Sequence, residues 1–115
     1  MPHLILEHSP SLAGSHDLPA LSSDLFQTAQ AHPAFASAPQ AVKTRTIAVD
    51  NVRSGVMPQT FAHLTVRLLS GRDDETKADI ANTLLAVLER HLPEVGSLSV
   101  EPVDMNRTTY AKRAL

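Results

Sequence analysis

The sequence predicts an α+β domain in which two strand–helix–strand units form one four-stranded sheet, with both helices on the same face. The segments run strand, helix, strand and then strand, helix, strand along the 115 residues. A weak internal repeat supports this order, because a shift of about 60 positions aligns residues 3–4 with residues 63–64, both His-Leu. The same shift aligns Pro33 with Pro93, at the end of each helix. Right-handed crossovers then place both helices on one side of the sheet.

The first unit covers about residues 2–52. The apolar run from residue 3 to residue 8 is typical of a buried strand. From Asp17 on, leucine and alanine recur at three- and four-residue spacing, which predicts a helix that ends at His32-Pro33. Either Asp17 or Ser15 is expected to cap its start. The segment 42–49 is rich in β-branched residues and predicts the second strand.

The second unit covers about residues 60–105. Its strands are predicted at residues 60–69 and 98–103, and a helix capped by Asp73 lies between them and ends before Pro93. The expected apolar stripe of this helix consists of Ala78, Ala81, Leu84, Leu85, Leu88 and Leu92. Both units together form a single domain, residues 1–115, because this length suits one hydrophobic core.

Composition excludes several classes of function. The chain has no Cys, so disulfides, thiolate zinc sites and a cysteine nucleophile are ruled out. A net charge of -2 with 3% aromatic residues argues against a nucleic-acid partner, since phosphates need a basic surface and bases need stacking platforms. No apolar run approaches the roughly 20 residues of a membrane span, and the N-terminus lacks the features of a signal peptide. We therefore expect no membrane partner and a cytoplasmic location.

Six histidines are the first candidates for chemistry, but their spacing does not favour it. No HExxH motif or helical histidine pair is present, so no metal site is expected. We expect His3 and His63 to lie on strands with partly buried rings, and the other four histidines to face solvent. The chain also lacks a G-x-S-x-G motif and a glycine-rich phosphate loop.

Pro2 is a stronger candidate because of its position. A small second residue allows the initiator Met to be removed, which leaves a prolyl amine at the start of the first strand. An ordinary α-amino group titrates near pH 7.7–8, and burial or nearby cations lower its pKa. Such an amine could act as a general base. The alternative is that the chain begins Met-Pro for no catalytic reason.

Three cations accompany this amine in the predicted fold. Lys43 and Arg45 share one strand face, and Arg72 directly precedes a helix N-terminus, where a carboxylate would meet free backbone N–H groups. The alternative reading is that each is an ordinary surface charge. An amine base beside anion-binding groups suits abstraction of a proton next to the carbonyl of a dicarboxylate-like acid, with return of the proton elsewhere.

The order of short motifs along nearly the whole chain resembles a known family, the 5-carboxymethyl-2-hydroxymuconate isomerases of the tautomerase superfamily. Each match is short, but their shared order is specific. The matching segments are Pro2-His3 with Glu7, Asp17-Leu18-Pro19, Lys43 to Arg45, Phe61 to Thr65, Ser70-Gly71-Arg72, Leu98 to Glu101, Thr108 and Lys112.

The resemblance implies a tautomerase-like fold, a homotrimer with active sites between subunits, and a small-molecule carboxylate substrate. It implies that Pro2 is the general base and that no metal or organic cofactor is used. Arg72 matches a family arginine, and Arg45 matches a second basic position. Lys43 stands where the family has arginine, and a lysine supplies a point charge instead of a planar bidentate grip. The implied setting is the catabolism of aromatic acids such as homoprotocatechuate.

Two other functions remain open on the same fold. Relatives in the superfamily carry out hydration, dehalogenation or decarboxylation with the same prolyl amine, and the Lys43 departure leaves room for such a reaction. A non-catalytic, oligomeric ligand-binding protein would keep Pro2 by descent alone.

Overall fold

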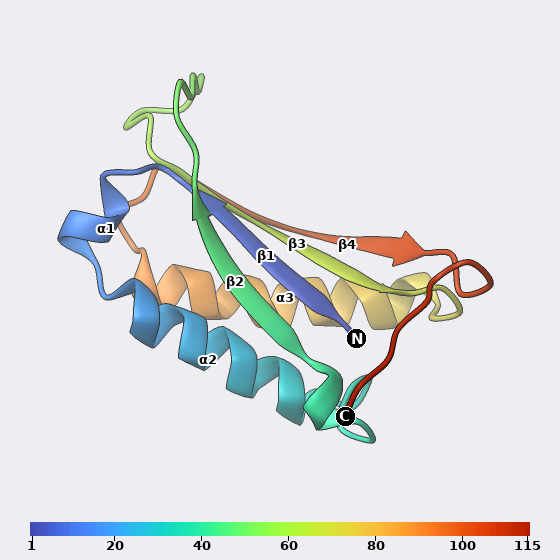
Figure 1. The fold of residues 1–115 in the computed structure, drawn as a ribbon. Helices are drawn as coiled ribbons and strands as arrows, with labels where there is room; N and C mark the ends of the chain where they lie inside the picture. Colours follow the sequence, from blue (N-terminus) through green and yellow to red (C-terminus); the bar gives the residue numbers. More distant parts are fainter.

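The computed structural model describes residues 1–115 and contains one four-stranded mixed sheet with its helices against one face (Figure 1). The strand order is β2-β1-β3-β4. The predicted fold class is therefore confirmed: two strand–helix–strand units share one sheet, and the long helices α2 and α3 lie on the same side of it (Figure 1).

The sheet is held together by two parallel pairs and one antiparallel pair. In the first unit, β1 (His3–His8) pairs in parallel with β2 (Lys43–Ala48), and His3 lies opposite Lys43. In the second unit, β3 (Phe61–Leu69) pairs in parallel with β4 (Ser97–Met105). The units join through β1 and β3, which run antiparallel. As a result, the start of β1 and the end of β3 meet at one end of the sheet.

The two long helices begin at the caps expected from the sequence. The helix α2 (Leu18–Ala31) starts after Asp17, whose carboxylate accepts a hydrogen bond from the backbone N–H of Ala20. The helix α3 (Asp74–His91) starts after Asp73 in the same way. Two short elements complete the chain: α1 (Leu12–Ser15) before α2, and the 3-10 turn η1 (Pro39–Ala41) before β2.

The core lies between the helices and one face of the sheet. Along β1, alternate residues are buried, so Leu4 and Leu6 point toward the helices and the odd-numbered residues point away. The buried face of α3 differs from the expected stripe. Leu84, Leu88 and Leu92 are buried as expected, and Ile80 and Val87 are buried with them. Of the other expected members, Ala81 and Leu85 are only partly buried and Ala78 is exposed, because the buried side of the helix is turned toward Ile80 and Val87.

The expectation that four histidines face solvent is wrong. His8 and His32 are only 3% and 8% exposed, and the other two are partly buried. Burial is possible because both ring nitrogens of His32 have partners: Nε2 lies 2.7 Å from the Asp79 carboxylate, and Nδ1 accepts a hydrogen bond from the backbone N–H of Ala34. The Nδ1 atom of His8 lies 2.8 Å from the carbonyl oxygen of Ser9.

The face of the sheet opposite the helices is not covered by any helix (Figure 1). After β4, the chain turns back and ends near the start of β2, so the C-terminus and the N-terminus lie close to the same end of the sheet (Figure 1). None of the helices combines the length and the apolar character that a membrane crossing requires.

Candidate active site

The N-terminus lies where β1 and β2 begin side by side. Pro2 is buried, and its carbonyl oxygen accepts a hydrogen bond from the backbone N–H of Lys43 at 3.0 Å, which extends the β1–β2 pairing. The amine of Met1 donates to the carbonyl oxygen of Ala41. The Nζ of Lys43 donates to the same oxygen at 3.0 Å. The chain terminus is therefore fixed next to a lysine ammonium group.

This environment changes the acidity of the terminal amine. Burial, followed by the charges of Lys43 and Lys112, lowers the pKa of the Met1 amine from 8.0 to about 6. Both causes act against the charged form of the amine. An amine at this position is therefore mostly neutral at pH 7 and can accept a proton.

A cavity of about 330 Å³ lies at this end of the sheet, and we call it the amine cavity. Its lining residues are Ala38, Gln40, Ala41, Lys43, Tyr110, Lys112, Arg113 and Ala114. Three of these carry positive charge and none carries a carboxylate. The amine cavity is therefore suited to an anionic ligand.

A second cavity of about 390 Å³ lies on the open face of the sheet, and we call it the arginine cavity. Its lining residues are His3, Arg45, Arg67, Met105, Thr109 and Tyr110. Within it, Nδ1 of His3 lies 3.3 Å from a guanidinium nitrogen of Arg45, and Nε2 lies 2.9 Å from the Tyr110 hydroxyl. Burial, then the charges of Arg45 and Lys43, lowers the pKa of His3 below its usual range. Tyr110 lines both cavities.

Arg72 has different surroundings from Lys43 and Arg45. Its guanidinium donates to the carbonyl oxygens of Leu69 at 3.2 Å and Ala34 at 2.9 Å, and it lies 5.2 Å from the ring centre of Phe35. Burial lowers the pKa of Arg72, since it disfavours the charged form. Arg72 lines neither the amine cavity nor the arginine cavity.

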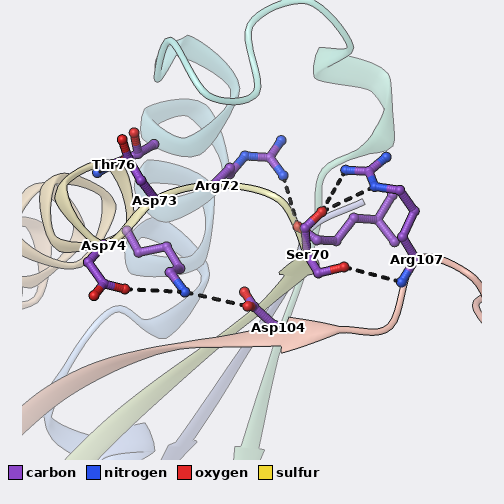
Figure 2. A network of polar contacts seen from close by, with 9 residues as sticks. Ser70, Arg72, Asp73, Asp74, Thr76, Asp104 and Arg107 are labelled. Atoms are coloured by element: carbon purple, nitrogen blue, oxygen red, sulfur yellow. Dashed lines mark hydrogen bonds and ion pairs between the residues drawn. The ribbon is translucent and has the colours of Figure 1, made fainter.

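Arg72 belongs to a polar network between the end of β3 and the start of α3 (Figure 2). Next to it, the Arg107 guanidinium donates twice to the carbonyl oxygen of Ser70, at 3.1 and 2.9 Å. An ion pair of 3.4 Å joins Lys77 on α3 to Asp104 on β4. These contacts connect the β3–α3 turn to the end of β4, and the side chain of Arg72 points from this turn toward the loop after α2 (Figure 2).

The structure thus brings together some of the residues that the sequence singled out. Lys43 lines the amine cavity, and Pro2 is joined to Lys43 by a backbone hydrogen bond without lining the cavity itself. Arg45 lies in the arginine cavity, next to His3. Arg72 lies apart from both cavities. Sequence reasoning did not assign His3, Arg67, Tyr110 or Lys112 to the site by their chemistry. Strand alternation could have placed His3 and Arg67 on one face, but the tail after β4 has no periodicity that would locate Tyr110. No three His, Asp or Glu side chains converge as metal ligands would.

The four-stranded sheet, its two long helices on one face and the cationic cavities at the N-terminus define a protein of the tautomerase fold. The chain belongs to the 5-carboxymethyl-2-hydroxymuconate isomerase family, whose sequence profile matches residues 2–112. Family membership and the structural neighbours support an isomerase or tautomerase type of function.

Three solved structures illustrate the similarity. A 5-carboxymethyl-2-hydroxymuconate isomerase from Deinococcus radiodurans R1 is 25% identical, with a TM-score of 0.81 over 97% of this chain and 88% of that one. A 5-carboxymethyl-2-hydroxymuconate delta-isomerase is 16% identical, with a TM-score of 0.82 over 99% and 89%. A fused 4-OT described as a symmetric trimer is 14% identical, with a TM-score of 0.71 over 96% and 93%. No curated protein sequence matches the chain.

Proposed function

We propose that this protein is a cofactor-free isomerase of an unsaturated oxo- or hydroxy-carboxylic acid, with the amine of Pro2 as general base. The observation that carries the proposal is the environment of the chain terminus, where burial and two lysines lower the pKa of the Met1 amine to about 6. The same surroundings would act on the amine of Pro2 once Met1 is removed. The substrate class that family membership suggests is 5-carboxymethyl-2-hydroxymuconate, in the catabolism of aromatic acids such as homoprotocatechuate.

The proposed reaction requires removal of Met1, which moves the free amine to Pro2, one residue along the strand. The neutral Pro2 nitrogen takes a proton from the carbon next to the substrate carbonyl, and the electron pair of that C–H bond passes into a dienolate. The prolyl ammonium then returns the proton to a different carbon, which shifts the double bond and regenerates the neutral amine. Positioned proton transfer of this kind contributes about 10²–10⁴-fold to the rate.

Cations stabilise the dienolate and hold the carboxylates of the substrate. Lys43 is the first of them, because its ammonium group shares the carbonyl oxygen of Ala41 with the terminal amine and lines the amine cavity. Arg45 lies on the same strand face and lines the neighbouring cavity. Arg72 is the third proposed group, and it would bind substrate through guanidinium N–H groups that do not donate to Ala34 and Leu69.

A homotrimer is part of the proposal, as in the symmetric trimer among the structural neighbours. The edge strand β2 is one surface available for subunit contact. Ile47 on β2 is 43% exposed in the single chain, and a subunit contact over this edge would bury its apolar side chain. Burial of this edge would also protect its unpaired backbone groups.

The test compares Pro2→Ala with Pro10→Ala, since Pro10 is exposed and lies outside both cavities. Mass spectrometry first establishes that Met1 is absent. The rise and fall of absorbance then reports turnover of 2-hydroxymuconate-type acids. We expect Pro2→Ala to lower kcat at least about 10²-fold and Pro10→Ala to leave it unchanged. Wild-type turnover by Pro2→Ala overturns the proposal, as does full activity of a preparation that retains Met1.

A further inference from the structure

The positive charges in the arginine cavity have no carboxylate partners within it. Arg45 and Arg67 both line it, and neither forms an ion pair. Among all lysine and arginine side chains, only Lys77 and Arg90 pair with carboxylates. No Asp or Glu is among the lining residues. Two guanidinium groups therefore face one cavity with no counter-charge from the protein, an arrangement that favours a bound anion.

The hydrogen bonds of His3 leave the hydroxyl group of Tyr110 as a further donor to this cavity. Arg45 carries only donors, so Nδ1 of His3 accepts its hydrogen bond and the proton of the neutral ring lies on Nε2. The Nε2–H group then donates to the oxygen of Tyr110. This leaves the hydroxyl hydrogen of Tyr110 free to donate to a ligand in the cavity that Tyr110 lines.

The side chain of Arg67 is the most available donor group. Arg67 lies opposite His3 on the neighbouring strand β3, and its guanidinium forms no hydrogen bond within the chain. All five of its N–H groups are therefore available to a ligand. Together with the remaining donors of Arg45, they form two planar forks, which suit the oxygen atoms of a carboxylate or a phosphate group.

The geometry points to an oxyanion-binding site in the arginine cavity, formed by Arg45, Arg67 and the hydroxyl of Tyr110 and separate from the amine cavity. A volume of about 390 Å³ fits a phosphate ion or a short dicarboxylate. The inference rests on the proposed function for Arg45, which is given there as a carboxylate-binding group, and it adds Arg67 and Tyr110 to the binding residues. Binding is measured without turnover, so a failure to bind the oxyanion is distinguished from a failure of the Pro2 amine to catalyse the reaction.

Tyr110 provides a built-in signal for the test. It is the only Tyr in the chain, and there is no Trp, so the tyrosine fluorescence of the protein reports on this side chain alone. The purified protein is titrated with inorganic phosphate and, in a second arm, with glutarate, both at constant ionic strength maintained with chloride. We expect a saturable change in fluorescence with a Kd of about 1 mM or tighter.

Three variants locate the bound ion. Arg67→Gln removes one guanidinium, and we expect it to weaken binding roughly tenfold to hundredfold. Arg53→Gln is the matched control, because Arg53 is exposed and contacts only the carbonyl oxygen of Val52, and it should leave the Kd within about twofold. Lys112→Gln removes a cation of the amine cavity, and its effect should be clearly smaller than that of Arg67→Gln.

Each outcome decides the question. Saturation by phosphate alone identifies a free inorganic oxyanion, whereas saturation by glutarate alone identifies the carboxylate of an organic ligand, and both support the site. Absence of saturation in both arms overturns it. Equal weakening by Arg67→Gln and Arg53→Gln would indicate only a general charge effect and overturns it as well. A larger effect of Lys112→Gln would place the ion in the amine cavity and overturn the separate site.

Discussion

Met1 and Lys43 donate hydrogen bonds to the same backbone oxygen, that of Ala41. Two groups that can both carry positive charge therefore lie side by side at the start of the sheet. Because a nearby positive charge disfavours protonation, the neutral form of the amine is favoured next to the charged lysine. Lys43, a residue of the edge strand β2, therefore helps to lower the pKa of the terminal amine.

The first prediction concerns the acidity of this amine. In a preparation that retains Met1, Lys43→Gln should raise the pKa of the Met1 amine above about 6, because the largest charge effect is removed while the effect of burial remains. The value should stay below the ordinary 8.0. The rate of N-terminal acetylation as a function of pH, followed by mass spectrometry, measures the pKa. Arg53→Gln serves as the control of equal charge change, and an identical shift in both variants contradicts the local explanation.

The second prediction concerns Arg72 and stability. Arg72→Met should lower the free energy of unfolding by about 1–3 kcal/mol, because two backbone carbonyl oxygens lose their charged donor and Phe35 loses a cation above its ring. Urea unfolding measures the change. Arg53→Met, at an exposed position, should stay within about 0.5 kcal/mol of the wild type. Equal stability of both variants would show that the Arg72 contacts contribute nothing.

The third prediction concerns the close approach of Gly96 to the loop before β3. An added Cβ at Gly96 would lie 1.8 Å from the carbonyl oxygen of Pro58 and 3.2 Å from that of Thr60. Gly96→Ala should therefore destabilise the protein by about 1–3 kcal/mol. Gly14→Ala is the control, since nothing lies within 4 Å of its added Cβ. Thermal unfolding of both variants should show a lowered Tm for Gly96→Ala only.

The fourth prediction concerns pH and His3. Burial and nearby cations lower the pKa of His3 in the folded protein below its ordinary value of 6.5. Between these two pKa values the unfolded chain binds more protons, so the stability that the neutral ring contributes is present above pH 6.5 and is lost as the pH falls through the folded pKa. Urea unfolding measures the free energies of unfolding of the wild type and of His3→Gln from about pH 7.5 to pH 5. The difference between the two should shrink as the pH falls. Parallel curves would contradict this.

Local signals in the sequence are sufficient to predict most of the fold. Alternation of apolar residues in β1 and the aspartate caps of α2 and α3 act over a few residues, so the sequence alone reveals them. The buried face of α3 was harder to predict, because a stripe of leucines and alanines can be turned by tens of degrees until Ile80 and Val87 face the core. That rotation depends on the packing of α3 against β4 and α2, which the sequence of the helix does not contain.

The side-chain positions that the sequence did not predict are set by contacts between residues far apart along the chain. His32 is buried because Asp79, 47 positions away, lies against its ring. Arg72 lines neither cavity, and its guanidinium instead contacts the carbonyl oxygen of Ala34 and the ring of Phe35. In contrast, Lys43 and Arg45 lie on the open face as strand alternation predicts, since that rule needs only the strand itself.

Tyr110 forms part of the wall of both cavities, and this position has a thermodynamic consequence. A ligand that changes the orientation of Tyr110 in one cavity changes the affinity of the other cavity for its own ligand. Linkage requires the effect to be equal in both directions, whichever ligand binds first. One aromatic side chain from the C-terminal tail can therefore couple the occupancy of the open face of the sheet to the chemistry of the chain terminus.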